Sequence, residues 1–142
     1  MQIRELDLKE LDTVYSVLKQ LRTTLSYTEF ENLIYDMRHI EYKMIGIMDN
    51  EELITYAGVA VSTNLYHKRH LYIFDLVTDE KYRSQKYGQM MLNYLVDYAN
   101  VAMCENIVLS SGFEKESAHR FYDSNGYNKK SFVFLKRLEK KS

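Results

Sequence analysis

The sequence predicts a mixed α/β or α+β fold built as one domain over residues 1–142. Short apolar runs typical of strands crowd the middle of the chain, and two strand–helix units follow them, which together favour a mixed sheet. Apolar residues make up 46% of the chain, enough for a protein of this length to bury one continuous core. A chain of 142 residues is also too short for two ordinary domains.

The first third of the chain predicts a short edge strand and two helices. The strand is expected at residues 2–4. The first helix begins at Asp7, whose side chain can cap the helix with Glu10 as its capping-box partner. The second helix begins at Thr28, with Glu31 three residues on in the same role. Apolar residues recur at helical spacing in both segments, so each helix has one face for the core.

The rest of the chain predicts strands with two helices between them. Strands at residues 42–48 and 53–62 form a hairpin, because the residues between them favour a turn. The strand at 71–77 is nearly all apolar, as is typical of a central strand covered on both faces. A long helix, a short buried strand, a short helix and a last strand are expected at residues 84–103, 107–110, 117–124 and 131–135.

The bulk composition argues against several function classes. A net charge of −1 gives no basic excess to hold nucleic acid. No run approaches the roughly 20 apolar residues that a membrane span needs, so no membrane partner is expected. The single cysteine, Cys104, and an N-terminus without a signal-peptide pattern predict a cytoplasmic protein. His67 and His70 have the spacing of two ligands, but no third candidate lies nearby, so no metal site is predicted.

A charged loop between the strand at 71–77 and the long helix is the segment best suited to bind a ligand. The start of a helix presents free backbone N–H groups and the positive end of the helix dipole, which suits a phosphate. Arg83 and Lys86 add positive charge, and Gly88 lets a ligand approach the backbone closely. The loop is therefore a candidate pyrophosphate cradle, with a plain solvated turn as the alternative.

Two motifs in the second half of the chain resemble those of the GNAT superfamily of N-acetyltransferases. Residues 83–88, Arg-Ser-Gln-Lys-Tyr-Gly, resemble the motif Arg/Gln-x-x-Gly-x-Gly/Ala that holds the CoA pyrophosphate, with Lys86 in place of the usual first glycine. Residues 118–127 resemble the segment Ala-x-x-Phe-Tyr-x-x-x-Gly-Phe/Tyr. Lys115 stands where the family often has asparagine, so a side-chain contact to CoA is either absent or made by Ser117.

The resemblance covers the whole chain and implies how it folds and binds acetyl-CoA. It implies a splayed mixed sheet of about six to seven strands flanked by about four helices, in which the strands at 71–77 and 107–110 diverge. Pantetheine would lie in the resulting slot, beside a β-bulge, and bond to the backbone of Leu76, Val77 and Asp79. The phosphates would lie over the loop and helix start formed by Arg83, Ser84, Gln85, Lys86, Tyr87, Gly88 and Gln89.

Acetylation of an amine also needs proton transfers, and two residues are candidates for them. A base must take a proton from the amine, and the departing thiolate needs one. In the second motif, the tyrosine at 122 would lie near the CoA sulfur as general acid, with a packed structural tyrosine as the alternative. Asp75, an acid within an apolar strand, is the candidate base, with a structural carboxylate as the alternative. The backbone N–H of Val77 or its neighbour would stabilise the thioester oxygen.

The resemblance therefore predicts direct attack by a primary amine on acetyl-CoA in a ternary complex, without a metal. A small molecule is the expected acceptor, because a chain this short has little room for a peptide groove. The acceptor pocket could draw on aromatic and acidic residues, namely Tyr27, Phe30, Tyr35, Tyr66, Tyr127, Phe132, Glu29, Glu31 and Asp36. Three alternatives stay open: a CoA-binding sensor or scaffold without transferase activity, a protein N-acetyltransferase, and assembly as a homodimer.

Overall fold

The computed structural model describes residues 1–140 and divides the chain into two compact units, residues 1–109 and the segment from Ser110 onward. The single acetyltransferase domain expected over residues 1–142 stays a prediction.

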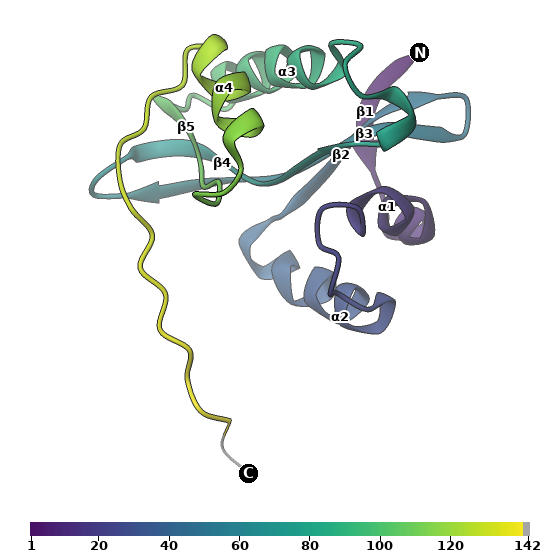
Figure 1. Ribbon diagram of the computed structural model, residues 1–142, viewed down its shortest axis with the longest axis horizontal. Coiled ribbons are helices and arrows are strands. Elements are labelled where there is room, and N and C mark those ends of the chain that lie inside the picture. Colours follow the sequence, from purple (N-terminus) through teal and green to yellow (C-terminus); the bar gives the residue numbers. More distant parts are fainter. Residues whose placement is uncertain (141–142) are drawn as a thin grey trace. The chain divides into compact units, whose positions relative to one another are not determined.

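A five-stranded mixed sheet forms the centre of the first unit (Figure 1), and it confirms the expected fold class. Its strands lie in chain order. The pairs β1–β2, β2–β3 and β3–β4 are antiparallel, whereas β5 runs parallel to β4. The strands are β1 (Gln2–Leu6), β2 (Lys43–Asp49), β3 (Glu52–Asn64), β4 (Lys68–Thr78) and β5 (Asn106–Leu109). The centres of β2 and β3 are continuously buried, because helices cover both of their faces.

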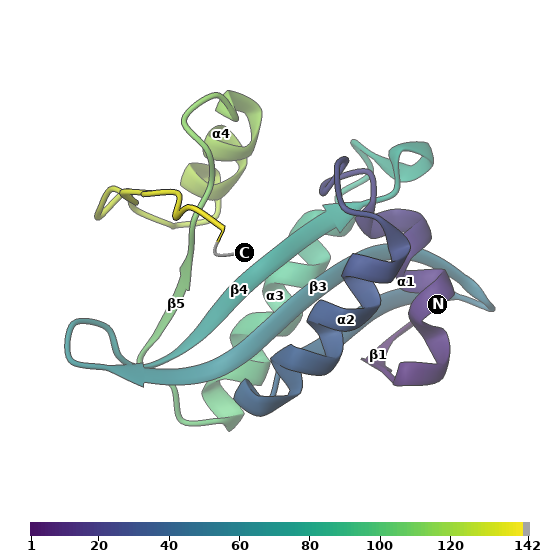
Figure 2. The same cartoon turned by 90° about the horizontal axis from the view of Figure 1, so that it is seen from below.

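Three α-helices cover the sheet of the first unit. Helices α1 (Leu11–Leu18) and α2 (Tyr27–Met37) lie on one face, and α3 (Tyr87–Val101) lies on the other (Figures 1 and 2). The buried residues of α1 and α2 share one apolar cluster with side chains of β2, β3 and β4. No helix within residues 1–140 combines the length and apolar character that a membrane crossing requires.

The helix starts confirm one predicted cap and correct another. Asp7 and Glu10 form the expected capping box, although it begins a 3-10 turn, Leu8–Glu10, that leads into α1. The cap expected at Thr28 is wrong, because Ser26 caps α2 and Glu29 completes the box, each bond measuring 3.2 Å. The earlier start makes Tyr27 the first helical residue, where its ring contacts Tyr15 at 5.3 Å between centroids. Either residue could cap a helix chemically. The contact of Tyr27 with Tyr15 depends on the tertiary structure, which local sequence patterns do not reveal.

The register of β4 creates an irregular edge next to β5. Gly58 pairs with Asp75 and Val59 pairs with Ile73, so Phe74 is an extra residue on β4, which is a β-bulge. The parallel ladder with β5 runs only from His70 to Ile73. Past Ile73, β4 continues without a β5 partner, and this is the splay that the fold class implies (Figure 2).

The second unit contains α4 (Glu116–Ser124) and an extended segment after it. Gly126 has a φ of +87°, as expected for a left-handed residue just past a helix. The strand predicted at residues 131–135 is wrong: the segment is apolar but has no strand partner within residues 1–140, and its large side chains are exposed. The described chain therefore has five strands and not six to seven, because strand-like composition does not form a ladder without a partner.

Candidate functional site

The connection from β4 to α3 presents backbone N–H groups without a side-chain cap. Lys86 is the N-cap residue of α3, and its side chain makes no capping bond. The first N–H groups of a helix have no acceptor inside it, and α3 is 15 residues long, so a positive dipole end is exposed here. Ser84 and Lys86 are left-handed, with φ of 65° and 69°, and such alternating backbone is typical of concave anion sites.

Lys86 keeps the backbone shape that the motif's glycine would give. A non-glycine residue in the left-handed region costs about 1 kcal/mol or more, which glycine would avoid. The substitution therefore leaves the turn in place and adds a positive side chain at an exposed position. Arg83 is also exposed, and its Nε donates to the carbonyl of Thr78 at 3.2 Å. Charge, left-handed backbone and an uncapped helix start fit a pyrophosphate, as does the placement of Gly88 in the first turn of α3.

The end of β4 carries the residues expected to meet pantetheine. Leu76 is half-buried and Val77 is buried, both beyond the end of the ladder with β5. Asp79 is also buried, and its backbone is already bonded: its N–H donates to the carbonyl of Ile54, and its carbonyl accepts from the N–H of Tyr82, both at 2.8 Å. The contacts predicted for these three residues stay predictions.

Asp75, the candidate base, is held by two side chains of the first unit. Its Oδ1 accepts from Nε of Arg22 at 3.0 Å, and its Oδ2 accepts from the hydroxyl of Tyr42 at 2.7 Å. The Asp75 side chain is 13% exposed, whereas Arg22 is 48% exposed. Arg22 also donates to the carbonyl of Phe74, the bulged residue, at 2.9 Å. Asp75 thus makes the arginine pairing that the structural alternative expected, while it also lies at the splayed edge of the sheet.

A second tyrosine continues this network into the core. The hydroxyls of Tyr42 and Tyr56 are 2.7 Å apart. Burial raises the pKa of Tyr42 well above its usual value, and burial is also the main cause that raises the pKa of Tyr56. Both phenols therefore keep their protons at neutral pH. Sequence reasoning missed both tyrosines and Arg22, although Gly58 inside an apolar strand was a signal of close approach by another group.

The second unit carries the candidate general acid. Tyr122 lies on α4, and its ring centroid is 5.3 Å from that of Phe121 and 5.7 Å from that of Tyr127. Burial raises the pKa of Tyr122 to about 12, with Tyr127 as a second cause. The hydroxyl of Tyr127 is buried and bonds to no group within residues 1–140. Ser117 is exposed in the first turn of α4. The roles of Tyr122 and Ser117 beside the residues of the first unit stay predictions.

Only some of the residues expected around the acceptor are free to line a pocket. Phe30 is 1% exposed and belongs to the core, and Glu29 completes the cap of α2. Tyr35 and Tyr66 are exposed. Among residues 1–140, no group of three or more histidines, cysteines and acids is arranged to hold a metal ion.

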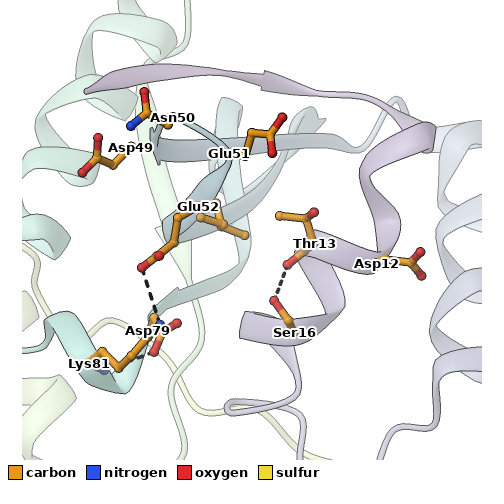
Figure 3. A pocket seen from close by; sticks show the side chains of 10 residues that line it. Asp12, Thr13, Ser16, Asp49, Asn50, Glu51, Glu52, Asp79 and Lys81 are labelled. Atoms are coloured by element: carbon orange, nitrogen blue, oxygen red, sulfur yellow. Dashed lines mark hydrogen bonds and ion pairs between the residues drawn. The ribbon is translucent and has the colours of Figure 1, made fainter.

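A shallow hollow of about 730 Å³ lies elsewhere in the first unit (Figure 3). It is lined by Asp12, Thr13, Ser16, Asp49, Asn50, Glu51, Glu52, Leu53, Asp79 and Lys81. Two of its acids already have structural partners: Glu52 accepts from the Tyr82 hydroxyl and pairs with Lys81 at 3.5 Å, and Asp79 caps the turn after β4. Of the residues predicted for the site, it includes Asp79 alone.

Comparisons with known proteins agree on one family. The acetyltransferase (GNAT) family model matches residues 7–127. The chain is 33% identical over 124 residues to the uncharacterized N-acetyltransferase YhdJ of Bacillus subtilis, which covers 86% of this chain and 87% of that protein. It is 27% identical over 144 residues to the aminoalkylphosphonate N-acetyltransferase of Salmonella typhimurium, covering 96% and 91% of the two chains.

The fold is also similar to that of an aminoglycoside N-acetyltransferase solved in complex with CoA. The TM-score is 0.81 at 12% identity, covering 96% of this chain and 93% of that one. At this identity the likeness shows the fold alone.

Proposed function

Because the chain belongs to the acetyltransferase (GNAT) family, we propose that it transfers the acetyl group of acetyl-CoA to the primary amine of a small molecule. The family and two N-acetyltransferase relatives support acetyltransferase activity.

The start of α3 is the observation that carries the proposal. The chain keeps a left-handed residue, Lys86, where the CoA motif has glycine, and it leaves the first turn of α3 without a side-chain cap. This backbone costs energy at a lysine, and here it stands together with an exposed helix start and the charges of Arg83 and Lys86. The oxygens of a bound pyrophosphate would accept hydrogen bonds from the free N–H groups and form ion pairs with Arg83 and Lys86.

The remaining residues divide the chemistry of transfer between them. The amine nitrogen forms a bond to the acetyl carbon while the carbon–sulfur bond breaks. The amine attacks in its neutral form and loses one proton toward Asp75, directly or through water, while the thiolate takes the phenolic proton of Tyr122. Solvent then returns a proton to Tyr122 and takes one from Asp75. A backbone N–H near Val77 stabilises the oxygen of the acetyl group as its negative charge develops.

A small amine is the proposed acceptor, and the aminoalkylphosphonate acetyltransferase relative supports this class. An acetyl-CoA-dependent screen tests it, with aminoalkylphosphonates, polyamines, amino acids, aminoglycosides and peptides as acceptors. Released CoA thiol is the readout. We expect turnover with at least one small amine, whereas turnover with peptides alone would favour a protein N-acetyltransferase.

Binding of acetyl-CoA separates a transferase from the alternatives. Calorimetry should detect binding, and Tm should rise, because a ligand at a hundredfold excess over its Kd adds about 2.7 kcal/mol to the free energy of unfolding. Binding without thiol release for any amine would favour a CoA-binding sensor or scaffold. Failure to bind at millimolar acetyl-CoA would exclude both a transferase and a CoA-binding sensor or scaffold.

A further inference from the structure

We propose that Tyr42 is a positioning residue for acetyl transfer. With Tyr56 behind it, Tyr42 fixes the carboxylate of Asp75 in one orientation at the bulge of β4. The inference rests on the proposed function, because it gives Asp75 a part in handling the acceptor amine.

The hydrogen bonds of the network run in a single direction. Tyr42 has one hydroxyl proton, which it uses in the hydrogen bond to Oδ2 of Asp75 at 2.7 Å. Its oxygen therefore accepts the hydrogen bond that the hydroxyl of Tyr56 donates. Both hydroxyls are shielded from water, and burial raises the pKa of each phenol. Asp75 therefore faces a neutral donor on its buried side throughout the neutral range, and a chain of two hydrogen bonds holds its Oδ2 in place.

Gly58 makes the position of Tyr42 possible. Gly58 is the cross-strand partner of Asp75 in the register of β3 and β4. A Cβ atom at residue 58 would lie 1.6 Å from the hydroxyl oxygen of Tyr42. The absent side chain therefore provides the space in which the phenol reaches the carboxylate, and the requirement is steric.

The other side of the carboxylate is the exposed one. Arg22, from the connection between α1 and α2, bonds to Oδ1 and to the carbonyl of Phe74. Its side chain is about half-exposed, whereas Tyr42 and Tyr56 lie behind Asp75 in the protein. The two buried phenols close the Oδ2 side of the carboxylate, so an acceptor amine would have to share Oδ1 with Arg22. Tyr42 thus fixes the acid from its buried side.

The variant Tyr42→Phe of the full chain tests the role, because it keeps the ring and removes only the donor. We expect kcat/KM for the acceptor to fall by roughly tenfold to a hundredfold, a typical effect of a misplaced catalytic group. The loss should fall on kcat more than on the KM for the acceptor, since the variant misplaces the carboxylate without removing it. The Kd for acetyl-CoA should not change.

Two further variants separate position from general damage to the core. Tyr56→Phe removes a buried hydroxyl that does not touch Asp75, so it should lower kcat in the same direction but less. Gly58→Ala keeps every hydroxyl but expels Tyr42, so it should reproduce the kcat loss of Tyr42→Phe. Should Tyr42→Phe fail to fold, Gly58→Ala and Tyr56→Phe decide the question, and a wild-type kcat in both would overturn the proposal.

The possible failures are distinguishable. A wild-type kcat and kcat/KM in Tyr42→Phe, beside an impaired Asp75→Asn, would overturn the positioning role and leave the transferase intact. If the wild type acetylates no amine, the proposed function fails. The contact is then judged by the Tm values of Tyr42→Phe, Asp75→Asn and the double variant: additive shifts would overturn it, and non-additive shifts would support it.

Discussion

The polar groups of Asp75 on β4 are hydrogen-bonded within the protein, whereas those of the loop that follows the strand are exposed. Both oxygens of the Asp75 carboxylate accept hydrogen bonds, and the side chain is only 13% exposed. Residues 83–86 are all exposed, and no side chain caps the first turn of α3 behind them. Fewer than ten residues along the chain thus separate a carboxylate with both oxygens bonded from a loop whose polar groups face solvent.

The difference suggests a division between chemistry and binding. Groups that act on developing charge work best when the fold fixes them in advance, because nothing then reorganises during the reaction. Groups that bind a charged ligand can stay in water until it arrives. Substitutions at β4 should therefore change stability and turnover together, whereas substitutions in the loop should change ligand affinity and leave the fold stable.

The largest effect is expected outside both regions, at Tyr122. Tyr122→Phe should lower kcat by the roughly 10²–10⁴-fold that general acid catalysis supplies, with little change in Tm or in the Kd for acetyl-CoA. Its raised pKa, about 12, means that the phenol keeps its proton through the neutral range, so its ionisation should limit the rate only near pH 12. Stopped-flow and steady-state assays between pH 6 and the highest tolerated pH would measure this.

Tyr127→Phe is the matched control for the acid. It also removes a buried tyrosine hydroxyl, one that bonds to no group within residues 1–140, so turnover should fall far less than in Tyr122→Phe. Equal losses in the two variants, or a joint loss of turnover and acetyl-CoA binding in Tyr122→Phe, would indicate a structural pair of tyrosines.

Gly88→Val should give the largest effect within the loop. The added branches would crowd the ligand at the start of α3, and crowding that costs about 1–3 kcal/mol weakens affinity roughly tenfold to a hundredfold. Calorimetry with acetyl-CoA measures the loss, and the Tm of the ligand-free protein should stay nearly constant. Unchanged affinity would remove residues 83–89 from the binding site.

Asp75→Asn probes the closed side of the comparison. It should lower the free energy of unfolding by about 1–3 kcal/mol, because two hydrogen bonds to a charged group are lost or weakened. It should also lower kcat/KM and remove the acidic limb of the pH–rate profile. Chemical denaturation and the pH series test the two parts, and an unchanged profile with reduced stability would return Asp75 to a purely structural role.

The smallest effect concerns the strain at Lys86. Lys86→Gly relieves the left-handed backbone and should raise the free energy of unfolding by about 0.5–1 kcal/mol, whereas Lys86→Ala keeps the strain. Both variants lose one positive charge and should weaken acetyl-CoA binding alike. A glycine variant no more stable than the alanine variant would contradict the left-handed conformation.

Local patterns in the sequence predict the short-range features of this structure but not the contacts between residues that are far apart in the chain. The Asp7–Glu10 cap is a short-range feature that residue spacing predicts correctly. Residues 83–88 also form a local motif, whose resemblance to the family's motif predicts a binding role that stays a prediction. The contact of Asp75 with Arg22 joins residues 53 positions apart, and it depends on a bulge that sequence periodicity cannot locate. Residues 131–135 show the reverse limit, because their composition favours a strand but only a partner strand can complete it.

The central claim is that an acetyl group passes directly from acetyl-CoA to an amine. Acetyl-CoA labelled in the acetyl group, mixed with the protein with and without the acceptor amine, tests it by mass spectrometry. We expect the label in the acetylated amine, and no change in protein mass without amine, since burial raises the pKa of the only thiol, Cys104, and disfavours its thiolate. Label retained on the protein, or an amine that never acquires it, would contradict the account.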